Sequence, residues 1–461
     1  MNAKLREIFS PRSVAVIGAL NSADRVGYHV MKSLVEGNYK GQIFPVNSEG
    51  RERCGMNSYP ALGEIADRVD LALIMAAPPL LPQILHECGK KMVKGVVLIT
   101  AGVREIEDAT EKVRQEEIGE IARQYGLPII GPTAFGFINR TFEVNATFIP
   151  ELSQLKKGGV ALISQSGEFC NLWGSLAIKY RMGISKMIGL GNRVNVGFPE
   201  LLRHLAEDDE KTGVVVLYIE ELDEPRNLFD TAKSLRGRKH LVAYKAGKGG
   251  KGQGASQFHT EWDEYRIWKG MFHQAGILEA ASAEELIDMA KILDACPRIK
   301  GPRIAVLSAQ AGPGIIAADA VEKAGLKLAR FSAQTQNTIN GLIPPHTIRT
   351  NPVDMGPIWL NAGNSLDILK AALEDDGTDG VIFIAIFASA NVHFAKCMAE
   401  YIEGADPFEK PVIAIFTAPP GIWEDEIAQI DGRKGVSILS TPERAGAAMG
   451  NLWRENLFLM K

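Results

Sequence analysis

The segment Val160-Ala161-Leu162-Ile163-Ser164-Gln165-Ser166-Gly167 runs from an apolar strand into a turn of small residues that opens a helix. The same arrangement occurs at 14–19 and at 304–314, so the chain contains it three times. Each turn would present backbone N–H groups and the positive end of a helix dipole, which favour a phosphate group. Three copies at nearly domain-sized spacing predict that phosphoryl groups are bound at more than one place and passed between them.

Strands and helices alternate along the chain around this segment. Apolar runs typical of buried strands lie at 13–17, 42–46, 71–75, 95–100, 128–130, 160–163, 214–218 and 240–246. Stretches with a helical pattern lie between or after them, at 80–90, 111–125, 170–180, 199–208, 226–236 and 283–293. Because strands that alternate with helices form parallel sheets covered on both faces, the sequence predicts an α/β protein.

The length of 461 residues exceeds what one hydrophobic core usually supports and favours three domains. Loop-like stretches at 148–159 and 296–302 divide the chain into 1–150, 151–298 and 299–461. The runs beginning at Val160 and Ile304 match each other at an offset of 144 positions. This match suggests that the second and third domains are related flavodoxin-like units.

The composition narrows the class of protein. Lys and Arg number 51 against 55 Asp and Glu, a net charge of −4, so we expect no nucleic-acid partner. No apolar run reaches the roughly 18 residues of a membrane span, and the first residues lack the apolar core of a signal peptide. The five scattered cysteines form no metal-binding pattern and fit a reducing compartment. We therefore expect a cytoplasmic protein with no metal site and no membrane contact.

Two familiar nucleotide motifs are incomplete. A nicotinamide site usually needs a second glycine soon after Gly18 and a carboxylate at the end of the second strand, where Asn47 stands instead. The basic segment 247–252 lacks the Ser or Thr that ends a P-loop. These departures favour another nucleotide-containing ligand at the first turn, although an ordinary strand-to-helix turn without a ligand is the simpler alternative.

Two side chains are candidates for phosphoryl chemistry. His259 follows the glycine-rich basic segment, which sets it apart from histidines inside helical stretches. Glu220 ends an apolar strand, at the edge where open α/β sheets bind ligands. A solvated loop residue is the plainer interpretation of each.

Many short motifs together resemble the NDP-forming acyl-CoA synthetase family, the superfamily of succinyl-CoA synthetase. The likeness covers essentially the whole chain and is greatest to the α-subunit of ADP-forming acetyl-CoA synthetase. The motifs that carry it, in family order, are 11–19, 39–47, 99–102, 131–133, 164–167, 189–192, 218–220, 311–314, 351–354 and 441–445. The resemblance implies a Rossmann-like CoA-binding domain followed by two flavodoxin-like CoA-ligase domains.

The resemblance also implies roles for particular residues. His259 would accept the phosphoryl group, and Glu220 would steady its ring. Two helix starts would hold the phosphohistidine: Ser164, Gln165, Ser166 and Gly167, and Ala311, Gly312, Pro313 and Gly314. The residues that would bind CoA are Gly18, Ala19, Asn21, Ser22, Asn47, Ala77, Pro78, Thr100, Ala101 and Gly102. Thr133 stands where the family has Asn, which implies an altered pocket for the acyl group.

The implied reaction converts a small carboxylic acid, CoA and ATP to acyl-CoA, ADP and phosphate, through an acyl phosphate and phospho-His259. An ATP-grasp β-subunit would bring ATP, ADP and Mg²⁺, so we expect a hetero-oligomer. The alternative is a regulatory module that binds CoA or acyl-CoA without catalysis. Around the histidine this chain has Phe258 and Glu261, where the family writes Ser and Gly.

Overall fold

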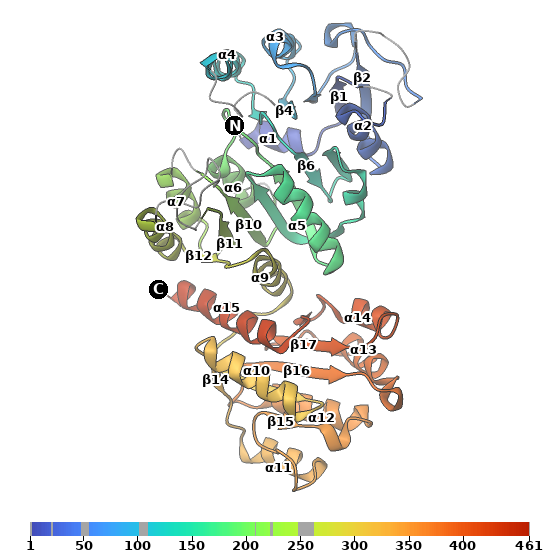
Figure 1. Ribbon diagram of the computed structural model, residues 1–461, viewed down its shortest axis with the longest axis vertical. Helices are drawn as coiled ribbons and strands as arrows, with labels where there is room; N and C mark the ends of the chain where they lie inside the picture. The colour runs from blue at the N-terminus through green and yellow to red at the C-terminus, as the bar shows by residue number, and fades with distance from the viewer. Residues whose placement is uncertain are drawn as a thin grey trace, which may run out of the picture. The chain divides into compact units, whose positions relative to one another are not determined.

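The computed structural model describes residues 2–19, 22–47, 55–100, 109–207, 209–221, 225–247 and 262–460 (Figure 1). By its internal contacts the chain divides into two compact units, Met1–Glu279 and Ala280–Lys461. Both units are α/β, as the sequence predicts. Among the described residues, no helix has both the length and the apolar character needed to cross a membrane.

The first sheet is parallel, with strand order β2-β1-β3-β4-β5. Its strands are β1 (Ser13–Ile17), β2 (Gln42–Val46), β3 (Leu71–Ile74), β4 (Gly95–Leu98) and β5 (Ile129–Ile130). The accompanying helices are α1 (Asn2–Phe9), α2 (Val26–Glu36), α3 (Leu81–Lys90) and α4 (Ala109–Tyr125), with short 3-10 turns η1 (Leu62–Glu64) and η2 (Pro78–Leu80). The bounds of the five strands and of α3 and α4 lie within a few residues of the predicted ones, whereas α1 and α2 were not predicted.

Alternating side chains of β1 enter two different cores. Val14 and Val16 pack in a cluster with α1 and α2, whereas Ala15 and Ile17 pack in a cluster with α3 and α4. Since successive residues of a strand point to opposite faces, a run that is apolar throughout requires a sheet buried on both sides. The first of these clusters continues into the second sheet, which joins the two sheets of the first unit.

The second sheet has the strand order β12-β11-β10-β8-β9-β6-β7. Its strands are β6 (Gly136–Asn139), β7 (Val144–Thr147), β8 (Lys156–Ser164), β9 (Gly183–Gly189), β10 (Val214–Ile219), β11 (His240–Lys245) and β12 (Ile277–Glu279). Its other elements are η3 (Pro150–Gln154), α5 (Gly167–Lys179), α6 (Phe198–Glu207), α7 (Pro225–Ser234) and α8 (Trp262–Ala275). All neighbouring strands are parallel except β6, which pairs antiparallel with β7 and β9.

Two features of this region differ from the sequence-based interpretation. The expected linker at 148–159 instead contains η3 and the first residues of β8, because Lys156 and Lys157 already pair with β9. The hairpin of β6 and β7, which was not predicted, extends the second sheet although its residues precede position 150. The division of the chain at 150 and 298 stays a prediction.

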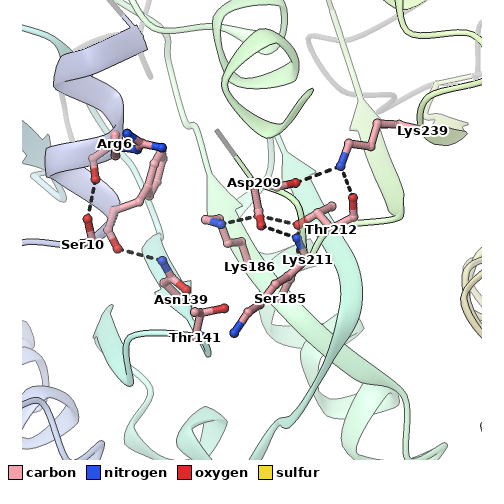
Figure 2. Close-up of polar contacts among 11 residues, drawn as sticks. Arg6, Ser10, Asn139, Thr141, Ser185, Lys186, Asp209, Lys211, Thr212 and Lys239 are labelled. Atoms are coloured by element: carbon pink, nitrogen blue, oxygen red, sulfur yellow. Dashed lines mark hydrogen bonds and ion pairs between the residues drawn. The ribbon is translucent and has the colours of Figure 1, made fainter. Parts of the chain in front are cut away.

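A buried ion pair fixes the amino-terminal edge of the second sheet. Lys186 of β9 pairs with Asp209, which also accepts a hydrogen bond from the hydroxyl of Thr212 (Figure 2). Lys239 Nζ donates to the carbonyl oxygens of Asp209, at 2.8 Å, and of Thr212. This cluster ties the segments that lead into β10 and β11 to β9, at the edge opposite the strands' carboxyl ends.

The second unit contains a sheet of order β14-β13-β16-β17-β18, with β15 also pairing with β13. The strands are β13 (Arg303–Ser308), β14 (Lys327–Leu328), β15 (Val353–Asp354), β16 (Gly380–Ile386), β17 (Val412–Thr417) and β18 (Val436–Ile438). The helices are α9 (Ala283–Ala295), α10 (Ala311–Lys323), α11 (Ala333–Leu342), α12 (Ala362–Glu374), α13 (Phe394–Gly404), α14 (Glu424–Ile430) and α15 (Pro442–Met460), with η4 (Gly356–Ile358) and η5 (Ser389–Asn391).

Helix α9 is anchored inside the second unit. Asp288 accepts two hydrogen bonds from the guanidinium of Arg444 on α15, at 2.8 and 2.6 Å. Lys291 pairs with Asp431, with 2.6 Å between Nζ and Oδ2, and both side chains are buried. Burial raises the pKa of Asp288, although Arg444 opposes the rise.

Candidate active site

The carboxyl ends of the first sheet are joined into one edge by hydrogen bonds. The Gly18 N–H donates to the Val46 carbonyl at 3.0 Å, and the Met75 N–H donates to the Ile17 carbonyl at 2.9 Å. The Thr100 hydroxyl donates to the Ala76 carbonyl at 2.8 Å. The turns after β1, β2, β3 and β4 therefore lie next to one another, at the edge where parallel sheets bind ligands.

Gly18 needs to be glycine in this turn. Its φ of +91° is one that side chains rarely adopt, and a Cβ there would lie 2.8 Å from the Met75 carbonyl oxygen. Gly27, at the start of α2, lies against the Gly18 carbonyl so closely that a Cβ would overlap it. A second glycine close to the turn therefore exists in space, although nine positions separate the two in the sequence.

The polar residues expected to bind CoA at this edge are partly engaged with the protein. The Asn47 side-chain amide donates to the Ala19 carbonyl at 2.9 Å, and the Ser22 hydroxyl donates to Asp24. Ala77 is exposed, and Pro78 begins η2. Asn21, Ala101 and Gly102 lie outside the described residues. Roles for all of these residues in CoA binding stay predictions.

Thr133 connects this edge to the second sheet. Its N–H donates to the Thr100 carbonyl at 3.0 Å, and the carbonyl of the preceding Pro132 accepts from the Asn192 N–H at 2.8 Å. The φ of Thr133 is +55°, unusual for a residue with a side chain. Among the described residues, its buried hydroxyl oxygen finds no hydrogen-bond partner. A strained residue with an unsatisfied hydroxyl is a reasonable point of contact for a ligand.

The carboxyl ends of the second sheet hold Glu220 in place. The Gln165 side-chain oxygen accepts hydrogen bonds from the N–H groups of Glu220 and Glu221, each at 3.0 Å. The buried Lys245 donates to the Glu220 carbonyl at 2.7 Å. Gln165, expected to contact phosphate, therefore has its side-chain oxygen committed to the backbone at Glu220.

Burial raises the pKa of the half-buried Glu220 carboxyl, and the nearby Glu168 raises it further. The nearby Tyr218 hydroxyl lowers this pKa, as do the charges of Lys245 and Arg193. The surroundings of Glu220 therefore act in opposite directions. Burial and Glu168 favour the protonated acid, whereas Tyr218, Lys245 and Arg193 favour the ionised carboxylate.

The turns that open α5 and α10 have the same construction. The Ser164 hydroxyl donates to the Ser166 carbonyl at 2.7 Å, and the Ser308 hydroxyl donates to the Gln310 carbonyl at 2.6 Å. Positions 164 and 308 differ by the 144 residues of the sequence match. The same hydrogen bond from a serine hydroxyl to a backbone carbonyl at both turns supports the interpretation that β8–α5 and β13–α10 are related units.

The two helix starts differ in their caps. On α5 the Ser166 hydroxyl accepts from the Phe169 N–H, whereas Gln310, the corresponding residue before α10, makes no such side-chain bond. The first N–H groups of a helix lack partners within it, so those of Ala311 and Gly312 have none within α10 and would favour an anion. Gly312 is exposed, and Pro313 has no N–H to offer. Phosphate binding at either start stays a prediction.

His259 lies outside the described residues, together with its neighbours Phe258 and Glu261. Its phosphorylation and its contact with Glu220 therefore stay predictions. Four features of the site were not anticipated from sequence: the Gly27 contact, the strained Thr133, the buried Lys245 and the ring of Tyr218. Thr133 itself was already predicted as a residue of the acyl pocket, although its strained backbone was not; of the other three, only Tyr218 lies in a motif that could have drawn attention to it.

Two family models match the chain. One is a CoA binding domain, over residues 12–140, and the other is a succinyl-CoA ligase like flavodoxin domain, over residues 157–293. The II subunit alpha of the ADP-forming acetate–CoA ligase from Pyrococcus furiosus is 35% identical, with 95% of each chain aligned. The ADP-forming acetate–CoA ligase I of Archaeoglobus fulgidus is 34% identical, but this chain covers 63% of that longer protein.

Two solved structures resemble this chain over nearly its whole length. The dinucleotide forming acetyl-coenzyme A synthetase 1 of Candidatus Korarchaeum cryptofilum, determined with phosphate and ADP, has a TM-score of 0.88 and 27% identity, over 100% of this chain and 99% of that chain. A protein from Pyrococcus horikoshii OT3 has a TM-score of 0.87 and 33% identity, over 99% of both chains. The chain belongs to the ADP-forming CoA ligase family, which confirms the resemblance noted in its motifs.

Proposed function

We propose that this chain is the CoA-binding, phosphohistidine-bearing subunit of an ADP-forming acid–thiol ligase. The enzyme would interconvert a carboxylic acid, CoA and ATP with acyl-CoA, ADP and phosphate. The observation that carries the proposal is the hydrogen-bonded connection between the two sheet edges. It runs from Thr100 through Pro132 and Asn192 to the turn after β9, where the Leu190 N–H donates to the Ser164 carbonyl at 2.8 Å.

The first edge fits a CoA-binding role. At Gly18 the missing Cβ lets the turn lie against the Met75 backbone, and the neighbouring turns supply a shared edge. When bound, CoA would supply the thiol that accepts the acyl group. The Thr133 hydroxyl, unsatisfied within the described residues, would contact the acyl part of the substrate.

The second edge fits phosphoryl transfer. The acyl phosphate would give its phosphoryl group to a ring nitrogen of His259, so that a P–O bond breaks, a P–N bond forms and the carboxylate leaves. Glu220 would accept the N–H of the other ring nitrogen and fix the reactive tautomer. The N–H groups at the start of α5 would offset the phosphoryl charge without donating an acidic proton, and the start of α10 is a second place where a phosphoryl group would be bound.

A partner subunit completes the proposed reaction. The relatives from Pyrococcus furiosus are named as alpha subunits, and the Archaeoglobus fulgidus protein is longer than this chain. We propose that an ATP-grasp subunit binds ATP, ADP and Mg²⁺ and receives the phosphoryl group from His259.

Calorimetry and turnover test the proposal together. The chain alone should bind CoA, and it should form acyl-CoA from ATP, CoA and acetate or a longer carboxylate only when the partner is added. Binding of NADH without any response to CoA would overturn the first part. Turnover of ATP by the purified chain alone would overturn the second. CoA binding with no turnover in any reconstituted complex would favour the regulatory alternative.

A further inference from the structure

Strand β14 ends the sheet of the second unit, and β13 is its one neighbour among the described strands (Figure 1). The N–H groups of Lys327 and Ala329 donate to the carbonyls of Pro302 and Ile304, at the start of β13, each at 2.9 Å. Because the backbone groups of successive strand residues point in opposite directions, the N–H and C=O of Leu328 point away from β13. Neither group has a hydrogen-bond partner among the described residues.

A cavity of about 830 Å³ lies along this free edge. Its lining includes the continuous segment 326–331 and residues of α10 and α11. Leu326 and Ala329 are buried and Phe331 is partly buried, so part of the lining is apolar. A free strand edge beside a cavity is suited to an extended peptide segment, which adds to the sheet through its own N–H and C=O groups.

Two carboxylates that contact lining residues are already engaged by the protein. Asp379 accepts two hydrogen bonds from the guanidinium of Arg303, each at 2.8 Å. Asp375 accepts hydrogen bonds from the N–H groups of Ser332 and Gly377, at 2.8 and 2.7 Å. These donors offset part of the negative charge of both carboxylates.

Two cations of the lining have no such partner. Lys327 and Arg330 are exposed, and neither side chain forms an ion pair with another residue in the described part of the chain. Glu322 is the carboxylate that lines the cavity itself. With Arg303 paired, the free edge therefore has an excess of positive charge.

This charge distinguishes between two occupants of the edge. Antiparallel pairing of β14 with β14 of a second copy would also satisfy the backbone groups of Leu328. It would, however, bring Lys327 and Arg330 of one copy close to the same cations of the other, and like charges on paired strands destabilise the pairing. Edge lysines commonly protect a sheet from such self-association. The charges therefore favour an occupant with acidic side chains.

We propose that the edge of β14 binds an extended acidic segment of a partner protein, which adds one strand to this sheet. Leu328 would exchange both of its backbone hydrogen bonds with the segment, and Lys327 and Arg330 would contact its carboxylates. The proposed reaction does not use this surface, so the test of the inference is independent of that reaction.

Fluorescence anisotropy with labelled peptides tests the backbone contact and the charge separately on the full chain. The probe is the peptide Glu-Val-Glu-Val-Glu, and its two controls are Lys-Val-Lys-Val-Lys and the acidic peptide with methylated backbone nitrogens. We expect the acidic peptide to bind about tenfold more tightly than either control, because only it offers both carboxylates and backbone N–H groups. Equal binding of the acidic peptide and its methylated form, or no binding of the acidic peptide, would overturn the proposal.

Variants of the edge locate the binding. Leu328→Pro removes the N–H that points away from β13, a change that edge strands tolerate, and Leu328→Ala keeps this N–H as the matched control. We expect Leu328→Pro to bind the acidic peptide about tenfold more weakly than Leu328→Ala, with a similar melting temperature. Equal affinity of these two variants would refute the role of the edge.

The charges and the second copy are tested in the same way. The double variant Lys327→Glu, Arg330→Glu should lose the preference for the acidic over the lysine peptide, and a preference that persists would contradict the assigned charge contacts. Sedimentation of the unmodified chain should show no dimer that depends on this edge. A dimer that is lost in Leu328→Pro would show that a second copy occupies the edge and would overturn the proposal.

Discussion

Gly18 shows how one residue can define a ligand site through the backbone. Its positive φ and the nearby Met75 carbonyl leave no space for a side chain, so the turn presents bare peptide groups at the sheet edge. The Gly27 contact brings the start of α2 against the same turn. The turn therefore depends on the absence of a Cβ at Gly18 and at Gly27, and a substitution that adds one methyl group tests this dependence.

We expect Gly18→Ala to weaken CoA binding at least tenfold, because the new Cβ would push the turn away from its present path. Gly126→Ala is the matched control: its φ of +56° imposes similar strain, but the nearest atom in its surroundings is Lys4 Nζ at 3.5 Å. The control should lose about 1 kcal/mol of stability and keep its CoA affinity. Titration calorimetry would decide, and equal CoA affinity of the two variants would contradict the assignment.

The raised pKa of Glu220 makes a prediction about pH. Burial is its main cause, so the carboxyl should become ionised above the ordinary glutamate range near about 4.3. Turnover should fall as the pH drops through this raised value, because the protonated acid cannot accept the imidazole N–H. Glu220→Gln should lower kcat about a hundredfold and lose this acidic limb. If the acidic limb of the pH profile lay at the same pH in Glu220→Gln as in the unmodified chain, a group other than Glu220 would control that limb.

Particular residues also show where prediction from sequence ends. Asn47 and Gln165 stand at the expected sheet edges, yet their side chains brace backbone groups 28 and 55 positions away. Local motifs place a residue at an edge, since strand ends are readable from apolar runs. They do not indicate which way the side chain turns, because its partner is distant in the sequence.

Among the elements, the start of α10 is the more open of the two phosphate candidates. Ala311→Pro would remove one N–H at the first helical position, where proline is well tolerated, and Gln310 already has the extended backbone that proline requires of its predecessor. We expect this variant to fold normally and to lose about tenfold in phosphoryl transfer. Ala311→Gly keeps the N–H and should retain activity; equal loss in both variants would refute the role of this helix start.

The ion pair of Lys186 and Asp209 stabilises the contact between β9 and the segment that leads into β10. Asp209→Asn leaves the buried ammonium without its counter-charge, which should cost about 3 kcal/mol in the free energy of unfolding. Although burial alone would raise it, Lys186 and Thr212 hold the pKa of Asp209 below its usual value. The pair therefore stabilises the fold at neutral pH and loses its effect as the pH falls through that lowered pKa.

Thermal unfolding at several pH values checks this expectation. The difference in melting temperature between the native chain and Asp209→Asn should be greatest near neutrality and should shrink below about pH 4. A difference that stays constant with pH would mean that packing, and not charge, accounts for the loss.

The strands that could be predicted from the sequence are those buried along nearly their whole length. The apolar runs of β1, β3, β10 and β13 are recognisable because both faces of each sheet are covered. The hairpin β6–β7 was missed, because its strands have only four residues each and include Asn139 and Asn145. Those polar side chains are satisfied by partners that become visible only in the fold.

For the whole molecule, the position of α9 distinguishes two ways of dividing the chain. The contacts of Asp288 and Lys291 connect α9 to the second unit, whereas the sequence-based division ends the middle domain at 298. We expect a fragment of residues 280–461 to unfold cooperatively at a higher temperature than a fragment of residues 299–461. Equal stability of the two fragments, measured by calorimetry, would favour the sequence-based boundary.

The central claim concerns His259 and is tested by direct labelling. The chain, its ATP-grasp partner, Mg²⁺ and ATP labelled in the terminal phosphate should give a protein-bound phosphate that is labile in acid and stable in base. Peptide mapping should place the phosphate on His259, and His259→Ala should lose both label and turnover while it keeps its affinity for CoA. A label that survives His259→Ala, or normal acyl-CoA formation by that variant, would contradict the phosphohistidine mechanism.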